Sequence, residues 1–91
     1  MASASEAFKK FSIWEKLKTP LKVTVMTNGR VEDIFSALIF GSDPDAGLVG
    51  IGIPATRSIA RFDVEDATFS VEEKRVVATR NESDWLVFEE D

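Results

Sequence analysis

The chain has 91 residues, 44% of them hydrophobic, with a net charge of −5 and with neither histidine nor cysteine. This length is typical of a single domain, and seven phenylalanines and two tryptophans are too many for a disordered chain. The missing residue types exclude disulfide bonds, thiol nucleophiles, histidine bases and most transition-metal sites. We therefore expect one domain over residues 1–91 that uses no cofactor and no metal.

The charge is distributed unevenly along the chain. Six of the eleven basic residues lie before Val31, whereas fourteen of the sixteen acidic residues lie after Arg30. The net negative charge opposes sequence-independent binding to a nucleic-acid backbone. The basic N-terminal part could bind an anion or the acidic part of a neighbouring subunit, but a solvated helix face is the simplest interpretation.

Targeting and membrane signals are not found in the sequence. The small and polar residues at the start are not followed by the apolar core of a secretory signal. No run approaches the ~18 apolar residues that a membrane-spanning helix requires. We expect a cytoplasmic protein without a membrane partner.

The first 19 residues predict a helix that runs from about Ser5 to Leu17. Ser3 or Ser5 can cap its start, and Pro20 disfavours helical conformation in the residue before it, which ends the helix. Apolar residues share one side at helical spacing, namely Ala7, Phe8, Phe11, Trp14 and Leu17. A helix of this kind could lie on a membrane, but it more often covers a sheet.

Residues 20–72 have the pattern of five short strands separated by turns. Asn28-Gly29 tolerates the positive φ angles of a tight hairpin turn, and residues 43–47 form a turn by composition. The expected strands lie at 21–27, from about 30 to 40, and at 48–53, 58–64 and 67–71. Residues 73–91 predict a further hairpin, with strands at 76–78 and 85–88, and then a solvated acidic tail.

The segment 31–40 is ambiguous between helix and strand. Its apolar residues recur at helical spacing, as Val31, Ile34, Phe35, Leu38 and Ile39. A long, bent strand that is buried on both faces would show the same mixed pattern. We favour the strand, because the Asn28-Gly29 hairpin signal precedes it.

Two segments resemble the motifs of the Sm and Sm-like RNA-associated proteins. The first is Asn28-Gly29-Arg30, which follows an apolar strand and is followed by a second strand that leads to Asp43. The second is Ile59-Ala60-Arg61-Phe62-Asp63-Val64, which is similar to the family's second motif. The chain departs from the family at Gly47, where the family has an RNA-contacting asparagine, and at Phe62, where it has glycine. The spacing from Gly29 to Asp43 is also longer than in the family.

The resemblance implies a mainly β fold in which an N-terminal α-helix precedes a strongly bent, five-stranded antiparallel barrel of the SH3-like or Sm-like type. It also implies a non-enzymatic protein that assembles into a homo-oligomeric ring of about five to seven subunits. Single-stranded RNA or a partner protein would then bind in a regulatory role. Arg61 is the residue most expected to contact RNA, and Asp43 would shape the neighbouring loop.

Arg57 and Arg61 would share one face if both were in a strand. With Phe62 nearby, they could present arginine and an aromatic ring to a single-stranded base. The alternative is that these arginines form ordinary surface ion pairs with Asp63, Glu65 or Glu72.

The residues leave two further functions to weigh, an adaptor and an enzyme or cation site. A structural or adaptor barrel that binds other proteins, and no nucleic acid, would suit the acidic pI of about 4.7. An enzyme or cation site would need organised carboxylates. However, residues 43–54 lack the glycine and glutamate positions of a calcium-binding loop, and the remaining acidic residues form no recognisable catalytic set. We therefore expect no enzymatic activity.

Overall fold

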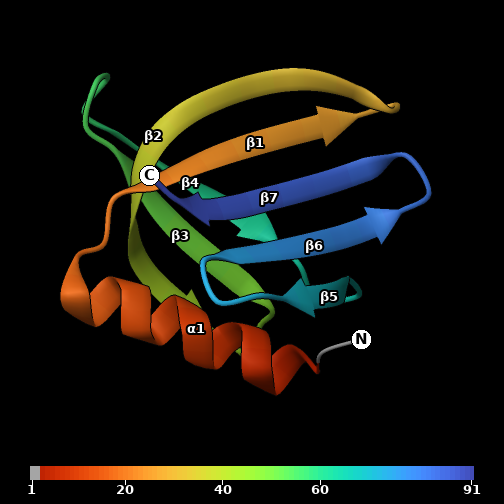
Figure 1. The fold of residues 1–91 in the computed structure, drawn as a ribbon, viewed down its shortest axis with the longest axis horizontal. Helices are drawn as coiled ribbons and strands as arrows, with labels where there is room; N and C mark the ends of the chain where they lie inside the picture. The colour runs from red at the N-terminus through yellow and green to blue at the C-terminus, as the bar shows by residue number, and fades with distance from the viewer. Residues whose placement is uncertain (1–2) are drawn as a thin grey trace.

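The computed structural model describes residues 3–91, and its fold is mainly β with one N-terminal helix (Figure 1). The helix packs on one side of an antiparallel sheet, as expected from its apolar side. The elements are α1 (Ala4–Leu17), β1 (Leu21–Thr27), β2 (Arg30–Asp43), β3 (Leu48–Ile53), β4 (Ser58–Asp63), β5 (Thr68–Val71), β6 (Arg75–Asn81) and β7 (Asp84–Glu90).

The sheet has seven strands in the order β4-β3-β2-β1-β7-β6-β5, so the five-stranded sheet that the resemblance implied is wrong. Five strands do form within residues 20–72, and the expected C-terminal hairpin is confirmed as β6–β7. This hairpin joins the same sheet, because β7 pairs with β1. The sheet does not close on itself, and β4 and β5 form its two edges.

The long strand β2 confirms that segment 31–40 is a strand. Its first half pairs with β1 and its second half with β3. A bulge at Glu32 shifts the alternation of side chains. Val31 and Ile34, which are three residues apart, therefore lie opposite Met26 and Thr24 on the same face of the sheet. The helical spacing in the sequence is thus the signature of a bulged strand.

Helix α1 is held by caps at both ends and by its apolar side. Ser3 Oγ accepts a hydrogen bond from the Glu6 backbone N–H at 3.2 Å, and Lys18 ends the helix in the left-handed conformation. Leu17 is 70% exposed, so its expected place in the core is wrong; it lies in the last turn, beside the helix end. Within residues 3–91, no helix is long and apolar enough to span a membrane.

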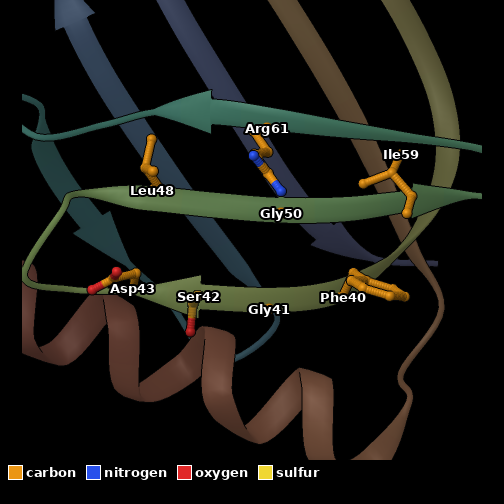
Figure 2. A pocket seen from close by; sticks show the side chains of 8 residues that line it. All are labelled: Phe40, Gly41, Ser42, Asp43, Leu48, Gly50, Ile59 and Arg61. Atoms are coloured by element: carbon orange, nitrogen blue, oxygen red, sulfur yellow. The ribbon is translucent and has the colours of Figure 1, made fainter.

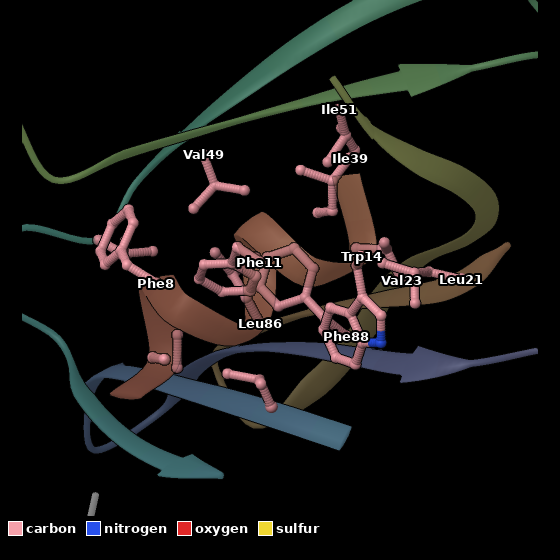
Figure 3. Packing of buried hydrophobic residues seen from close by; sticks show 14 of the residues in the cluster. Phe8, Phe11, Trp14, Leu21, Val23, Ile39, Val49, Ile51, Leu86 and Phe88 are labelled. Carbon is pink, nitrogen blue, oxygen red and sulfur yellow. The ribbon is translucent and has the colours of Figure 1, made fainter. Parts of the chain in front are cut away.

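The core lies between α1 and the concave face of the sheet (Figure 3). The rings of Phe11 and Phe88 lie 5.1 Å apart at a steep angle, which joins the helix to β7. Trp14 is 1% exposed and packs beside Phe11. These contacts explain why β7 is placed next to β1, since its inward side chains complete the core beneath the helix.

The expected acidic tail is wrong for two of its three residues. Glu89 and Glu90 belong to β7, which pairs with β1 up to Leu21. Glu90 Oε2 accepts a hydrogen bond from Trp14 Nε1 at 3.3 Å, and Glu89 forms a 3.1 Å ion pair with Lys22. The side chains of Trp14 and Lys22 therefore hold the end of β7 in place.

Candidate binding site on the outer face of β2, β3 and β4

The outer face of β2, β3 and β4 is built from strand residues that alternate with the core residues. Val49 and Ile51 of β3 are fully buried, so their neighbours Gly50 and Gly52 lie on the opposite face. The register places Gly50 between Gly41 of β2 and Arg61 of β4. Gly52 lies between Leu38 and Ile59 in the next row.

An open hollow of about 340 Å³ lies on this face (Figure 2). The Arg61 side chain reaches from β4 over Gly50, and Phe40 and Ile59 stand at one end of the hollow. A second, apolar hollow of about 210 Å³ adjoins the first and shares Phe40 and Ile59 with it. The first hollow is lined by Phe40, Gly41, Ser42, Asp43, Leu48, Gly50, Ile59 and Arg61.

The floor of the hollow is glycine backbone that the fold itself does not require. Gly41, Gly50 and Gly52 all have ordinary strand conformations, without positive φ. A Cβ atom at Gly41 or Gly52 would meet nothing within 4 Å, and one at Gly50 would make ordinary contact with Gly41 O at 3.6 Å. Glycine weakens a strand. The effect of Gly41 and Gly50 is to keep the first hollow open, and Gly52 does the same for the adjoining hollow.

The walls at one end of the hollow are unusually exposed apolar side chains. Phe40 is 66% and Ile59 is 59% exposed, although both belong to strands. Leu38, which is half-buried, lies beside them and lines the adjoining hollow. Contiguous exposed apolar side chains of this kind commonly mark interaction surfaces.

The structure brings two of the three predicted site residues together, because Asp43 and Arg61 line the same hollow. Asp43 Oδ1 accepts hydrogen bonds from the backbone N–H groups of Asp45 at 3.1 Å and Ala46 at 3.2 Å. Asp43 therefore holds the turn that follows β2, which is an Asx-type arrangement. This is the loop-shaping role expected for it.

Arg57 lies outside β4, so the condition under which it would share a strand face with Arg61 is not met. Arg57 precedes β4 and has a positive φ of 55° in the turn that follows Pro54. Its backbone N–H bonds to Pro54 O at 3.3 Å. The side chain lines the adjoining apolar hollow and not the one that contains Arg61.

Phe62, the aromatic residue expected beside the arginines, faces the core. Its ring lies 6.2 Å from that of Phe88. Phe40 occupies the exposed position instead. The one sequence signal for this is period-two alternation, which places Phe40 and its neighbour Ile39 on opposite faces of a strand, and Ile39 is buried. The bulge between Ile39 and Gly41, which sequence cannot locate, sets its final direction.

The charges near the hollow are mostly acidic. Arg61 forms no ion pair within 4.0 Å among residues 3–91, and Glu72, one of its expected partners, instead pairs with Arg75 at 2.8 Å. The chain segments on either side of the hollow carry Asp45, Asp63, Glu65 and Asp66. In the described part of the chain, no group of three or more acidic side chains is placed to hold a metal ion.

No protein-family model, curated protein or solved structure matches this chain. The relationship to Sm-like proteins therefore stays a prediction from the sequence motifs. The candidate site must be judged by its own geometry and chemistry.

Proposed function

We propose that this protein is a non-enzymatic interaction module that binds a segment of another protein on the outer face of β2, β3 and β4. The observation that carries the proposal is the floor of Gly41, Gly50 and Gly52, which costs strand stability and gives the fold nothing in return. A side chain of a partner can enter the space that these glycines leave open. Phe40 and Ile59 would become buried in the complex.

The composition of the site favours a protein segment over a nucleic acid. Phe40 and Ile59 offer apolar area that a partner can cover, which stabilises association. A phosphate backbone would have to approach Asp43 and the acidic residues around it in a chain of net charge −5. Arg61 is the one basic residue that lines the hollow. The adaptor function suggested by the acidic pI is thus the one that the geometry supports best.

The proposal is tested by selecting ligands from a library of random peptides on the wild-type protein and on Gly50→Val. Valine would fill the hollow and keep strand conformation, so we expect peptides that bind the wild type to lose binding to Gly50→Val. Ser36→Val is a matched control, because Ser36 is an exposed residue of β2 that does not line either hollow. Equal binding of the selected peptides to all three proteins would reject the hollow as the site.

A second candidate function, single-stranded RNA binding by a homo-oligomeric ring, is favoured by one observation. Phe40 and Arg61 line the same hollow, and an exposed ring with a guanidinium can stack and fix a base. Asp43 could accept a hydrogen bond from an exocyclic amine of that base. In a ring, the unpaired edges β4 and β5 would join neighbouring subunits.

Two measurements decide this second candidate. Light scattering on a sizing column would give one closed species of about five to seven copies for a ring, and a monomer would reject it. Arg61→Ala should weaken binding to single-stranded RNA at low salt, whereas Lys16→Ala on the exposed side of α1 serves as a control for general charge. Unchanged affinity of Arg61→Ala would remove this residue from an RNA site.

A further inference from the structure

The strand β4 is an unprotected edge of the sheet. It pairs with β3 only, and among residues 3–91 its backbone forms no hydrogen bond outside that ladder. The opposite edge, β5, is only four residues long and lies against α1. An unpaired edge strand offers N–H and C=O groups to an added strand. The β4 edge therefore gives a partner segment a place to pair beside the hollow.

The outward side chains of β4 form an ordered row of three different chemistries. Ile59 is apolar, Arg61 is basic and Asp63 is acidic, and alternation in the strand places all three on the outer face. The polarity extends beyond the strand, since Arg57 precedes it while Glu65 and Asp66 follow it. The edge is thus basic near its start and acidic at its end.

We propose that the partner is an extended segment that adds to β4 as an antiparallel strand and carries, in chain order, a basic, an acidic and a bulky apolar residue at alternate positions. The basic residue would lie opposite Asp63, the acidic residue opposite Arg61 and the apolar residue opposite Ile59. This inference rests on the proposed protein-binding function and names the chemistry of its ligand. Opposite charges and apolar pairs directly across strands stabilise an antiparallel ladder, and like charges destabilise it.

The surface next to Ile59 explains why the partner residue opposite it should be large and apolar. Ile59 is 59% exposed, and Phe40, which lines the same two hollows, is 66% exposed. A large side chain that covers Ile59 can lean over Gly52 toward Leu38 and Phe40, because no Cβ atom stands at Gly52. A small or charged residue at this position would leave both side chains in water. The apolar residue therefore links pairing at the edge with occupation of the hollow.

A second copy of this chain offers only part of the complementary row. The outward residues of the other edge, β5, are Thr68 and Ser70, because Phe69 between them is buried. Two β4 strands paired about Arg61 would place like charges opposite each other, and two paired about Phe62 would place Arg61 opposite Asp63 but Glu65 opposite Ile59. The apolar position opposite Ile59 thus favours a segment of a different protein.

The test uses three short peptides that differ only at the specified positions. The first has the basic–acidic–apolar order, the second has the two charges exchanged, and the third has serine in place of the apolar residue. We expect the first to bind the wild-type protein about tenfold more tightly than the second. The double variant Arg61→Glu/Asp63→Arg should reverse this preference, and amide shifts should map to β4. Lys16→Glu is a control, since Lys16 is an exposed residue of α1 and lines neither hollow.

The outcomes separate this inference from the proposed function. If library peptides bind in a way that Gly50→Val abolishes, while exchange of the two charges changes nothing, the proposed function stands and the charge order is rejected. If the peptides bind equally to wild type and Gly50→Val, both fail. If the protein self-associates and the association is lost in Ile59→Lys, the partner is a second copy and the inference is overturned.

Discussion

Gly41 of β2 and Gly50 of β3 are direct cross-strand partners on the outer face of the sheet. A pair of facing glycines leaves backbone uncovered where two side chains would normally pack together. Neither residue has positive φ, and neither position is too crowded for a Cβ atom. A side chain can therefore be added at either glycine without a clash, so the site can be tested without disrupting the fold.

Replacement of Gly50 by valine should leave the fold intact or make it more stable. Glycine in a strand is less favourable than a residue with a side chain, so we expect the free energy of unfolding to be unchanged or to rise by up to about 1 kcal/mol. Urea unfolding followed by circular dichroism measures this quantity. A large loss of stability would mean that Gly50 is structural, and the argument from the glycine floor would fail.

Substitution of Gly47 should destabilise the protein, unlike substitution of Gly41, Gly50 or Gly52. Gly47 has a φ of +67°, and a Cβ atom there would stand 2.5 Å from Glu65 Cα. Its carbonyl also accepts a hydrogen bond from the Val64 N–H at 2.7 Å. Gly47→Ala should therefore destabilise the protein by about 2 kcal/mol or more. Gly29 has a similar φ of +73° with nothing within 4 Å, so Gly29→Ala isolates the backbone strain, which is about 1 kcal/mol. Equal losses in the free energy of unfolding for Gly47→Ala and Gly29→Ala, measured in urea, would contradict the close packing at Gly47.

The hydrogen bond from Trp14 to Glu90 should make the end of β7 important for stability. Glu90→Ala leaves the nearly buried indole N–H without its acceptor, which costs about 1–2 kcal/mol. Glu90→Gln keeps an acceptor and should cost less. Glu89→Ala is the control, because its ion pair with Lys22 is partly exposed and is worth at most about 1 kcal/mol. Equal losses of stability for Glu89→Ala and Glu90→Ala would mean that the hydrogen bond from Trp14 to Glu90 adds no stability.

Asp84 should link stability to acid pH. The Asn81 side chain donates to its carboxylate at 2.8 Å and the Asn28 backbone N–H donates at 3.1 Å, and these hydrogen bonds lower the pKa of Asp84 below its ordinary 3.8. Its stabilising contribution is present above the pKa of the unfolded chain and is lost as pH falls through the lower folded-state pKa. Asp84→Asn should therefore destabilise the protein at neutral pH, and the difference from wild type should shrink in acid. A difference that persists unchanged to low pH would contradict this assignment.

Local signals in the sequence predicted most of the elements. Asn28-Gly29 located the first hairpin, and the serine cap and apolar spacing located α1. These local signals do not predict which strands pair with each other in the sheet. Whether β5 or β7 pairs with β1 depends on which side chains fill the core under the helix, and Phe88 does so through contacts with residues distant in the sequence.

The candidate site was predicted only in part for the same reason. Arg61 and Asp43 were found through their motifs, but their shared hollow depends on the register of three strands. Whether Arg57 shares a face with Arg61 was left open, because nothing in its local sequence predicts a left-handed residue after the turn at Pro54. Phe40 was missed because local sequence does not locate the shift in register between Ile39 and Gly41.

The central claim is that a partner segment binds on the outer face of β2, β3 and β4. The decisive measurement is the map of amide chemical-shift changes when a peptide selected on the wild-type protein is added. The account predicts that the largest changes fall on β4 and on Gly41, Gly50 and Gly52, and that they disappear in Gly50→Val. Changes concentrated on α1 or on β6 and β7 would place the binding site elsewhere and contradict the account.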